Sequence, residues 1–455
     1  MSLEARLTSF VEQSSFAGVK RAEPLGSGAS RVTWLVELAD AREVVLRVDS
    51  GDGPMAGTPL TLAREATVYA ALRETGLAIP RLLATTPEGD ALLVEKAPGR
   101  ESLDGLDGAA RTRVMEGYVD ALAALHGLDA SRLALPGFER PGPAEAARAE
   151  LALWRGVLES RVRRPAPLAH FAFAWLERNA PPPAERIVLC HGDVGPGNFL
   201  HDGERVTALL DWEFAHLGDP LDDLAWLAFR GHHLNDDVGD LAAQLRRWSE
   251  RSGLAVDARR VAWYRALVML RMLVSCFAAL DSGAAALDRT VYLTLPVLLG
   301  ALLPRALAEL AGVDPGPKPA QPVACASEEA EVLASLSTDL MQVVFPALPE
   351  RTHARARGMA LRLLHLQAAD RFAASVREAE GEALARALGG RPAALGRTPG
   401  DPAGAAFELQ ARVGAEPDAR WIPFFAESGA RRIALWPFLA GVAAKPLAKL
   451  EANGA

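Results

Sequence analysis

Cysteine is scarce in this sequence of 455 residues, and the three that occur, Cys190, Cys276 and Cys325, form no CxxC pair. A disulfide framework needs several cysteines at regular spacings, so the sequence argues against this class of protein. Free thiols suit a reducing compartment, and Cys190 is predicted to be a buried thiol. The cysteines therefore carry none of the expected chemistry.

Positive charge is also in short supply, because 49 lysines and arginines face 57 aspartates and glutamates, giving a net charge of −8. Such a chain exerts no long-range attraction on phosphate backbones or anionic lipid, so nucleic acid and membrane surfaces are rejected as partners. A site for an anionic nucleotide would then need metal ions held locally.

The sequence lacks a basic, apolar leader and a long uninterrupted apolar run. Its first residues are amphipathic and include Glu4 and Glu12, unlike an export signal. The most apolar stretch, residues 293–303, is too short to cross a bilayer and contains Pro296, so it is predicted to be a buried helix. We therefore expect a cytoplasmic protein.

What the chain does contain is enough apolar material for packed cores, since half of its residues are hydrophobic. Its length exceeds what one core usually supports, which predicts more than one domain. Residues 19–49, 81–87 and 90–99 show strand patterns, whereas helical periodicity dominates from residue 109 onward. A β-rich part followed by a helical part predicts an α+β protein of two lobes.

One segment concentrates polar residues between apolar strands. It reads VLCHGDVGPGNFLHDGERVTALLDWE and places His191 and Asp193 on a glycine-rich loop. The Asp202-Gly203 turn predicts a β-hairpin with Asn198 and Asp211 at its two open ends, which brings those side chains together. Phosphoryl transfer needs a carboxylate to accept the acceptor's proton and oxygen ligands for Mg²⁺, and these residue types fit both tasks.

The phrases HGDVGPGN and LLDWE resemble the catalytic loop and metal-binding segment of the aminoglycoside phosphotransferase and choline kinase superfamily. WEFAHLGDPLDDLAW and LAALHGLDASRLALPGF are similar to the branch found fused to acyl-CoA dehydrogenases. The resemblance covers about the first two thirds of the chain. It implies a bilobal protein-kinase-like fold, use of ATP and Mg²⁺, and a small-molecule hydroxyl as phosphate acceptor.

The resemblance also implies roles for single residues. Asp193 corresponds to the catalytic base, and His191 to the residue that supports its loop. Asn198 and Asp211 correspond to the metal ligands. Glu213 matches a DxE form that binds or orients a second Mg²⁺.

In the first lobe, Gly26 and Gly28 are predicted to form a turn between strands that covers the ATP phosphates, although a glycine pair is more often only a turn. Arg47 and Glu65 occupy the positions where such kinases usually carry a lysine and its glutamate partner. Arginine is a planar fork and lysine a point charge, so this is a real departure. Residues Glu95 to Ala97 fall where the hinge backbone meets adenine.

These assignments give predicted boundaries. Residues 1–98 form the N-terminal nucleotide-binding lobe, and residues 99–314 form the C-terminal catalytic and acceptor-binding lobe. Residues 315–326 are rich in proline and are predicted to be a linker. Residues 327–455 form a helical domain of unknown role, whose Ala- and Leu-rich faces predict a homodimer through the C-terminal helices.

Alternatives remain open at this level. A catalytically silent nucleotide-binding module is suggested by Arg47 and the added helices, and a metal-dependent hydrolase is a distant third because it usually needs more His or Glu ligands. Four arginines between residues 259 and 271 favour an anionic or acyl-CoA-like acceptor, whereas solvated helix faces are their commoner explanation.

Overall fold

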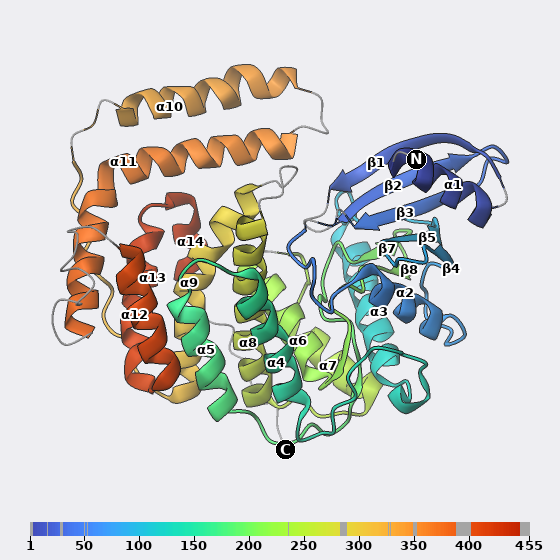
Figure 1. Cartoon of the computed structure of the whole chain (residues 1–455), viewed down its shortest axis with the longest axis horizontal. Helices are drawn as coiled ribbons and strands as arrows, with labels where there is room; N and C mark the ends of the chain where they lie inside the picture. Colours follow the sequence, from blue (N-terminus) through green and yellow to red (C-terminus); the bar gives the residue numbers. More distant parts are fainter. Residues whose placement is uncertain are drawn as a thin grey trace.

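The structure is a computed structural model and describes residues 3–445, apart from residues 16, 28–30, 50, 52, 235, 283–288, 326, 328, 349–352 and 388–401. Figure 1 shows a sheet-containing lobe on one side of the molecule and a larger helical part on the other. The two-lobed α+β architecture predicted from the sequence is confirmed.

The N-terminal lobe is built on a five-stranded antiparallel sheet in the order β1-β2-β3-β5-β4. Alternating apolar residues place Val36, Leu38, Val44 and Leu46 in one small core beneath α1 (Leu3–Ser15). The strands are β1 (Val19–Ser27), β2 (Arg31–Leu38), β3 (Glu43–Asp49), β4 (Leu82–Thr85) and β5 (Ala91–Glu95).

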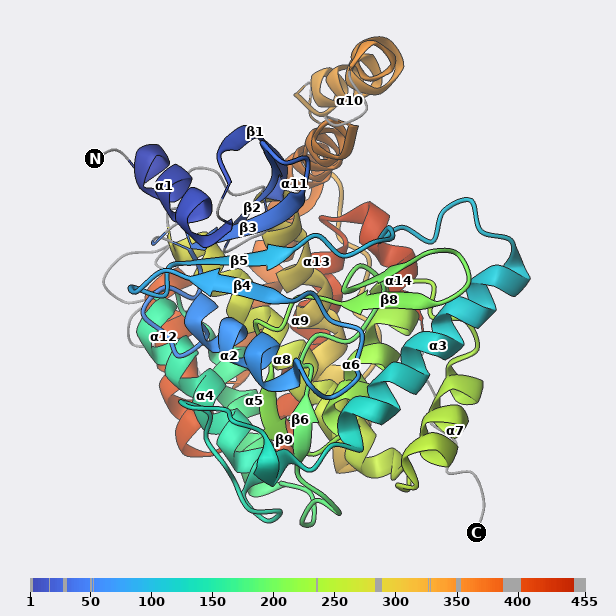
Figure 2. The same ribbon diagram turned by 90° about the vertical axis from the view of Figure 1, so that its right-hand side faces the viewer.

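Helix α2 (Leu62–Leu72) covers the other face of this sheet (Figure 2). Thr61 caps it, because the Thr61 hydroxyl accepts a hydrogen bond from the N–H of Arg64 at 3.2 Å and so satisfies a donor that the first turn leaves unpaired. Glu65 in that first turn is fully buried. The helix thereby carries a carboxylate into the space between the lobes.

The C-terminal lobe begins with α3 (Gly108–His126), α4 (Ala146–Arg161) and α5 (Pro167–Arg178). Two short antiparallel pairs follow, β6 (Val188–Cys190) with β9 (His216–Gly218) and β7 (Phe199–His201) with β8 (Val206–Leu209). The second pair is the hairpin predicted from the Asp202-Gly203 turn. Next come α6 (Leu221–Phe229), a π-helical turn over Arg230–Leu234 and α7 (Leu241–Ser252).

Helices α8 (Ala258–Ser282) and α9 (Arg289–Ala311) pack against each other in the centre of this lobe. The stretch around residues 293–303 is helical as predicted, but the helix is longer, because α9 continues through Pro296 and Pro304. Both helices are long and apolar enough to cross a membrane by length and composition. Burial within the protein covers 83% of such a window in α8 and 50% in residues 291–311.

Where the structure describes residues 329–445, their helices form no separate hydrophobic cluster. Residues 313–325 are irregular where the structure describes them, as expected of a linker. Beyond it, α12 (Pro402–Ala415) packs on α5, and α13 (Ile422–Ile433) packs on α9. Their buried Val413, Ile422 and Phe425 join the same hydrophobic cluster as the C-terminal lobe. The position of the domain boundary therefore remains a prediction.

Helix α10 (Glu329–Asp339) lies against α11 (His353–Ala387) and stands clear of the body (Figures 1 and 2). Its buried Ala330 and Ser337 are seven residues apart and share one face, whereas Val332 and Leu336 lie exposed on another. The short helix α14 (Ala440–Ala444) ends the described chain. The predicted homodimer through these helices remains a prediction.

Candidate active site between the lobes

The loop from His191 to Asn198 connects β6 to β7 and is fixed by one buried carboxylate. Asp223, on α6, accepts hydrogen bonds from the N–H groups of His191 (2.7 Å) and Gly192 (2.8 Å). His126 Nε2 lies 2.9 Å from the same carboxylate. Burial opposes ionisation, but His126 and these donors lower the pKa of Asp223. The anion thus holds the loop through its backbone.

His191 connects this loop to the strand end that carries Asp211. Its Nε2–H donates to the carbonyl of Leu210 at 2.7 Å, while Nδ1 accepts from the N–H of Asp193 at 3.3 Å. Both ring nitrogens of His191 are engaged in hydrogen bonds and the side chain is buried. The imidazole therefore holds the loop in place and is not positioned to transfer a proton. This agrees with the supporting role predicted for His191.

Asp193 projects from the loop with 22% of its side chain exposed, and Arg230 Nη1 lies 3.4 Å from its Oδ1. Arg230 also pairs with Asp236 and donates to the carbonyl of Pro196. Burial raises the pKa of Asp193, and the Arg230 guanidinium acts against that rise. The structure therefore combines an accessible carboxylate with a cation that favours its charged form.

Glycine at position 195 is needed for Arg230 to reach this loop. A Cβ atom added to Gly195 would lie 2.6 Å from both Cδ and Nε of Arg230. The N–H of Gly195 donates to the Tyr118 hydroxyl at 3.0 Å, which fixes the backbone from the other side. Arg230, at the start of the π-helical turn, can therefore contact the loop only while residue 195 is glycine. π-Helical turns are frequent at functional sites.

Asn198 and Asp211 come together at the open end of the β7-β8 hairpin, as predicted. The N–H of Leu210 donates to the carbonyl of Asn198 at 2.9 Å. The Asn198 amide Nδ2 donates to the carbonyl of Asp193 at 2.6 Å, so its amide oxygen is left for another partner. Asp211 adopts a left-handed backbone conformation with φ of 61°, which aspartate and asparagine tolerate better than most residues.

Arg47 and Glu65 form the ion pair predicted between β3 and α2. Arg47 also crosses to the other lobe, where Nη2 donates to Asp211 Oδ1 at 3.0 Å. Burial opposes ionisation of Asp211, but Arg47 and Arg31 outweigh it and lower the pKa of this carboxyl. One arginine therefore connects the N-terminal sheet to the predicted metal ligand.

Arg31 makes a parallel connection that the sequence did not predict. Its Nη1 lies 2.6 Å from Glu65 Oε2 and 3.2 Å from Glu213 Oε2. Despite this arginine, burial and the neighbouring Asp211 raise the pKa of Glu213. The two carboxylates of the DxE sequence thus lie close enough to repel each other.

The other predicted nucleotide contacts lie on the N-terminal sheet. Gly26 is not in the predicted turn, because it pairs with Thr33 inside β1 and β2 next to an irregularity in register; Gly28 lies outside the described residues. Glu95 ends β5, where its N–H donates to the carbonyl of Arg81 at 2.9 Å. Ala97 is half-buried two residues later. The hinge role of residues 95–97 stays a prediction.

The donor set fits Mg²⁺, which prefers hard oxygen ligands and keeps part of its water shell. Within the part of the chain that the structure describes, the amide oxygen of Asn198 accepts no hydrogen bond, and Asp211 is 34% exposed. Glu213 is 17% exposed. A divalent cation would also relieve the repulsion between Asp211 and Glu213.

A second group of buried ionisable residues has a different character. Glu150, His216 and Asp222 are buried near one another, but Arg271 pairs with both carboxylates. His216 Nε2 lies 3.2 Å from Asp222 Oδ2. The carboxylates act against the cost of burial and raise the pKa of His216 to about 9. Two cations therefore balance two anions, and a metal ion is not needed.

Three of the four arginines expected to mark an anionic acceptor are used inside the protein, and the fourth, Arg259, is exposed. Arg271 is buried in the cluster just described, and Arg265 pairs with Glu309 at 2.9 Å. Arg260 pairs with Asp219 at 3.2 Å. Each of these three arginines has a carboxylate partner within the fold. They therefore neither form a solvated helix face nor offer an unpaired charge to an acceptor.

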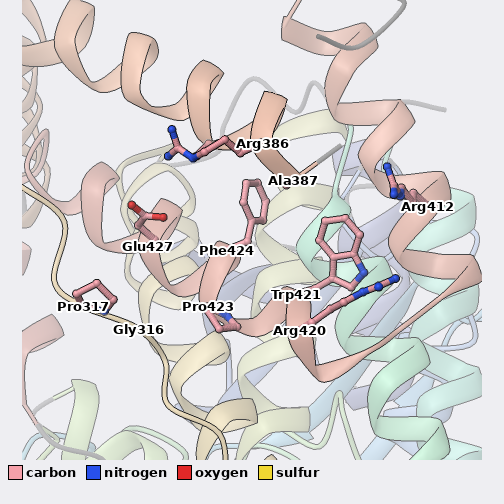
Figure 3. Close-up of a pocket in the computed structure, with 11 residues that line it drawn as sticks. Gly316, Pro317, Arg386, Ala387, Arg412, Arg420, Trp421, Pro423, Phe424 and Glu427 are labelled. Atoms are coloured by element: carbon pink, nitrogen blue, oxygen red, sulfur yellow. The ribbon is translucent and has the colours of Figure 1, made fainter. Parts of the chain in front are cut away.

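A cavity of about 460 Å³ lies elsewhere, between residues 316–317 and the helices α11 to α13 (Figure 3). Trp421 and Phe424 line it together with Arg386, Arg412 and Arg420. None of its lining residues belongs to the segment from His191 to Glu213. The cavity is therefore separate from the candidate active site.

Sequence reasoning missed three residues that organise the site. Asp223 lies in the DPLDDLAW phrase, which was noted without assigning a role to that carboxylate. Arg31 directly follows the glycine-containing segment, a position that could have drawn attention to it. Arg230 ends an apolar helical run, and nothing local indicates that it reaches Asp193.

Comparison with known proteins places residues 21–266 in the family described as "Phosphotransferase enzyme family". The mouse acyl-CoA dehydrogenase family member 10 is 27% identical over 210 residues, which are 44% of this chain and 19% of that protein. An aminoglycoside 3'-phosphotransferase of Streptomyces fradiae is 28% identical over 218 residues, 45% of this chain and 78% of that protein.

Among solved structures, a choline kinase of Streptococcus pneumoniae is 18% identical with a TM-score of 0.49 and covers 68% of this chain and 99% of that one. The chain spans less than a third of the length of the acyl-CoA dehydrogenase relatives that it matches.

Proposed function

Because the chain belongs to the phosphotransferase enzyme family, we propose that it is a small-molecule kinase that uses ATP and Mg²⁺ to phosphorylate a hydroxyl group. One observation carries the proposal. Asp193 is accessible on a loop whose backbone is fixed by Asp223, and the oxygens of Asn198 and Asp211 lie at the neighbouring hairpin end.

In the proposed reaction Asp193 accepts the proton of the acceptor hydroxyl. The acceptor oxygen bonds to the γ-phosphorus, the bond from that phosphorus to the β–γ bridging oxygen breaks, and ADP leaves with the electron pair. Asp193 carries the proton until the product departs. Positioning supplies most of the rate, since a fixed loop keeps the base where the hydroxyl must lie.

Asn198, Asp211 and Glu213 would hold Mg²⁺, which neutralises charge on the phosphates when it is bound. Arg47 would lie beside the phosphates, held by Glu65 and Asp211. The N-terminal sheet then supplies the nucleotide-binding face, with the β5 end at residues 95–97 near the base.

The acceptor is proposed as a small molecule with a free hydroxyl. Relatives are named for aminoglycosides and choline, so this chemistry suits varied acceptors. The anionic or acyl-CoA-like preference loses its original basis, because Arg260, Arg265 and Arg271 are paired with carboxylates. The acceptor class is best found by a screen that includes cationic, neutral and anionic hydroxyl compounds.

A catalytically silent nucleotide-binding module is the second candidate, favoured by Arg47 standing in place of lysine. The two candidates differ in turnover. Purified protein with Mg²⁺ and ATP is expected to release ADP with the right acceptor and to lose this activity in Asp193→Asn. Nucleotide binding without ADP release from any acceptor in the screen would support the silent module.

A further inference from the structure

Glu65 is unusual because two arginines share it. Its Oε2 accepts from Arg31 Nη1 at 2.6 Å, and its Oε1 pairs with Arg47 Nη1. The carboxylate is fully buried, and the Arg31 side chain is 3% exposed. A buried carboxylate needs one cation to balance its charge. The second guanidinium therefore has a charge that Glu65 alone does not neutralise.

The sheet register explains how both arginines reach one carboxylate. Arg31 stands opposite Asp49, and Arg47 stands opposite Thr33. Residues 31 and 33 share a face of β2 because side chains alternate along a strand, so Arg31 and Arg47 are diagonal neighbours on one face of the sheet. Both side chains then extend under α2 toward the catalytic lobe.

Each arginine ends on a carboxylate that would hold Mg²⁺. Arg31 lies against Glu213, and Arg47 against Asp211. Within the described residues the Nε atoms of both arginines are buried without a hydrogen-bond partner. If Asp211 and Glu213 bind a metal cation, Arg47 and Arg31 each lose a carboxylate partner. Buried guanidinium groups then need another anion as hydrogen-bond acceptor.

The charge balance points the same way. Among the residues that the structure describes, the guanidinium groups of Arg31 and Arg47 pair with three carboxylates, namely Glu65, Asp211 and Glu213, so that this set of side chains carries a net charge of −1 when all five are ionised. A bound divalent cation would change this to one surplus positive charge, which suits a polyphosphate. Without Arg31 the same site would only reach neutrality.

We propose that Arg31 is a second phosphate-binding residue, which forms with Arg47 a two-arginine clamp around Glu65 for the phosphates of the nucleotide. This inference rests on the proposed function, because the ligand is the nucleoside triphosphate. Arg31 suits the task because it is the first residue of β2 and follows the segment after Gly26 directly.

The test compares ATP with adenosine, which lacks the phosphates, by calorimetric titration of the full chain with and without Mg²⁺. Arg31→Met is expected to weaken ATP binding roughly tenfold or more, the loss of a hydrogen bond to a charged group, and to leave adenosine within about twofold. Arg21→Met removes an exposed arginine on β1 and is the matched control, expected to change neither affinity.

Arg31→Lys keeps the positive charge but removes the planar guanidinium group. It keeps the test interpretable if Arg31→Met does not fold. It is expected to weaken ATP relative to adenosine by roughly threefold. If the ratio of ATP affinity to adenosine affinity is unchanged in either folded variant, whether or not both affinities fall, the two-arginine clamp is overturned. If the unchanged protein binds no ATP, the proposed function fails and takes the clamp with it; if it binds ATP and the ratio stays constant, only the clamp fails.

Discussion

Two clusters of carboxylates and cations in this protein draw residues from the segment between Asp193 and Asp222, and they differ in exposure and charge balance. The cluster of Glu150, His216, Asp222 and Arg271 is buried, with each side chain at most 7% exposed, and its charges cancel. In the active-site cluster Asp193 and Asp211 are 22% and 34% exposed, and carboxylates outnumber the arginines. Accessible, unbalanced charge distinguishes a site for ligands from a structural network.

The sharpest test of this contrast is Asp193→Asn. It should lower turnover by roughly 10²–10⁴-fold, because the acceptor proton loses its base, and should leave nucleotide affinity and thermal stability near those of the unchanged protein. Steady-state kinetics and nucleotide titration measure both. Asp104→Asn, on an exposed loop, is the control. Retained turnover would remove Asp193 from the mechanism.

The buried cluster should respond in the opposite way. Asp222→Asn leaves Arg271 and His216 with Glu150 as their one remaining carboxylate in this cluster and is expected to reduce the free energy of unfolding by about 3–5 kcal/mol. Asp237→Asn breaks an exposed pair with Arg111 and should cost at most about 1 kcal/mol. Chemical denaturation compares them. Equal small losses would show that the buried cluster contributes no more than a surface pair.

The stability that the buried cluster contributes should depend on pH through His216. The pKa of His216 is raised to about 9 in the folded chain, above its value of about 6.5 in an unfolded chain. Its contribution is therefore fully present below pH 6.5 and is lost as the pH rises through about 9, up to about 3 kcal/mol. The difference in unfolding free energy between the unchanged protein and His216→Gln should shrink over this range. A constant difference would exclude the charged histidine.

The smallest expected effect concerns the metal ligands. Asp211→Asn keeps a residue that tolerates the left-handed backbone but removes the carboxylate charge. It should weaken nucleotide binding roughly tenfold in Mg²⁺, as the loss of one charged ligand. Binding measured in a chelator serves as the internal control and should change little. Loss of affinity in the chelator as well would point to a folding defect rather than a lost ligand.

Local spacing was enough to predict the hairpin of β7 and β8. The Asp202-Gly203 turn fixes which strand ends meet, so Asn198 and Asp211 could be paired from the sequence alone. Arg31, Asp223 and Arg230 could not, because their partners lie more than 30 residues away and depend on how the lobes and helices pack.

The errors have physical reasons as well. Residues 293–303 are helical as predicted, but α9 runs beyond them and continues through Pro296 and Pro304. Burial of Leu298, Leu299 and Leu302 outweighs a cost of about 3 kcal/mol for a proline inside a helix. Gly26 was placed in a turn because glycine is typical of turns, whereas the structure pairs it with Thr33. The arginines of α8 looked like a ligand site because a helical pattern does not reveal buried carboxylate partners on other elements.

Arginine at positions 31 and 47 has a consequence for the working range of the protein. A buried ammonium group gives up its proton readily, whereas a guanidinium stays protonated at every pH at which proteins fold. The proposed two-arginine clamp therefore keeps its positive charge, and with it its attraction for polyphosphates, at alkaline pH. As the pH rises through about 9, this protein should lose stability through the neutralisation of His216, while the guanidinium groups of Arg31 and Arg47 keep their charge.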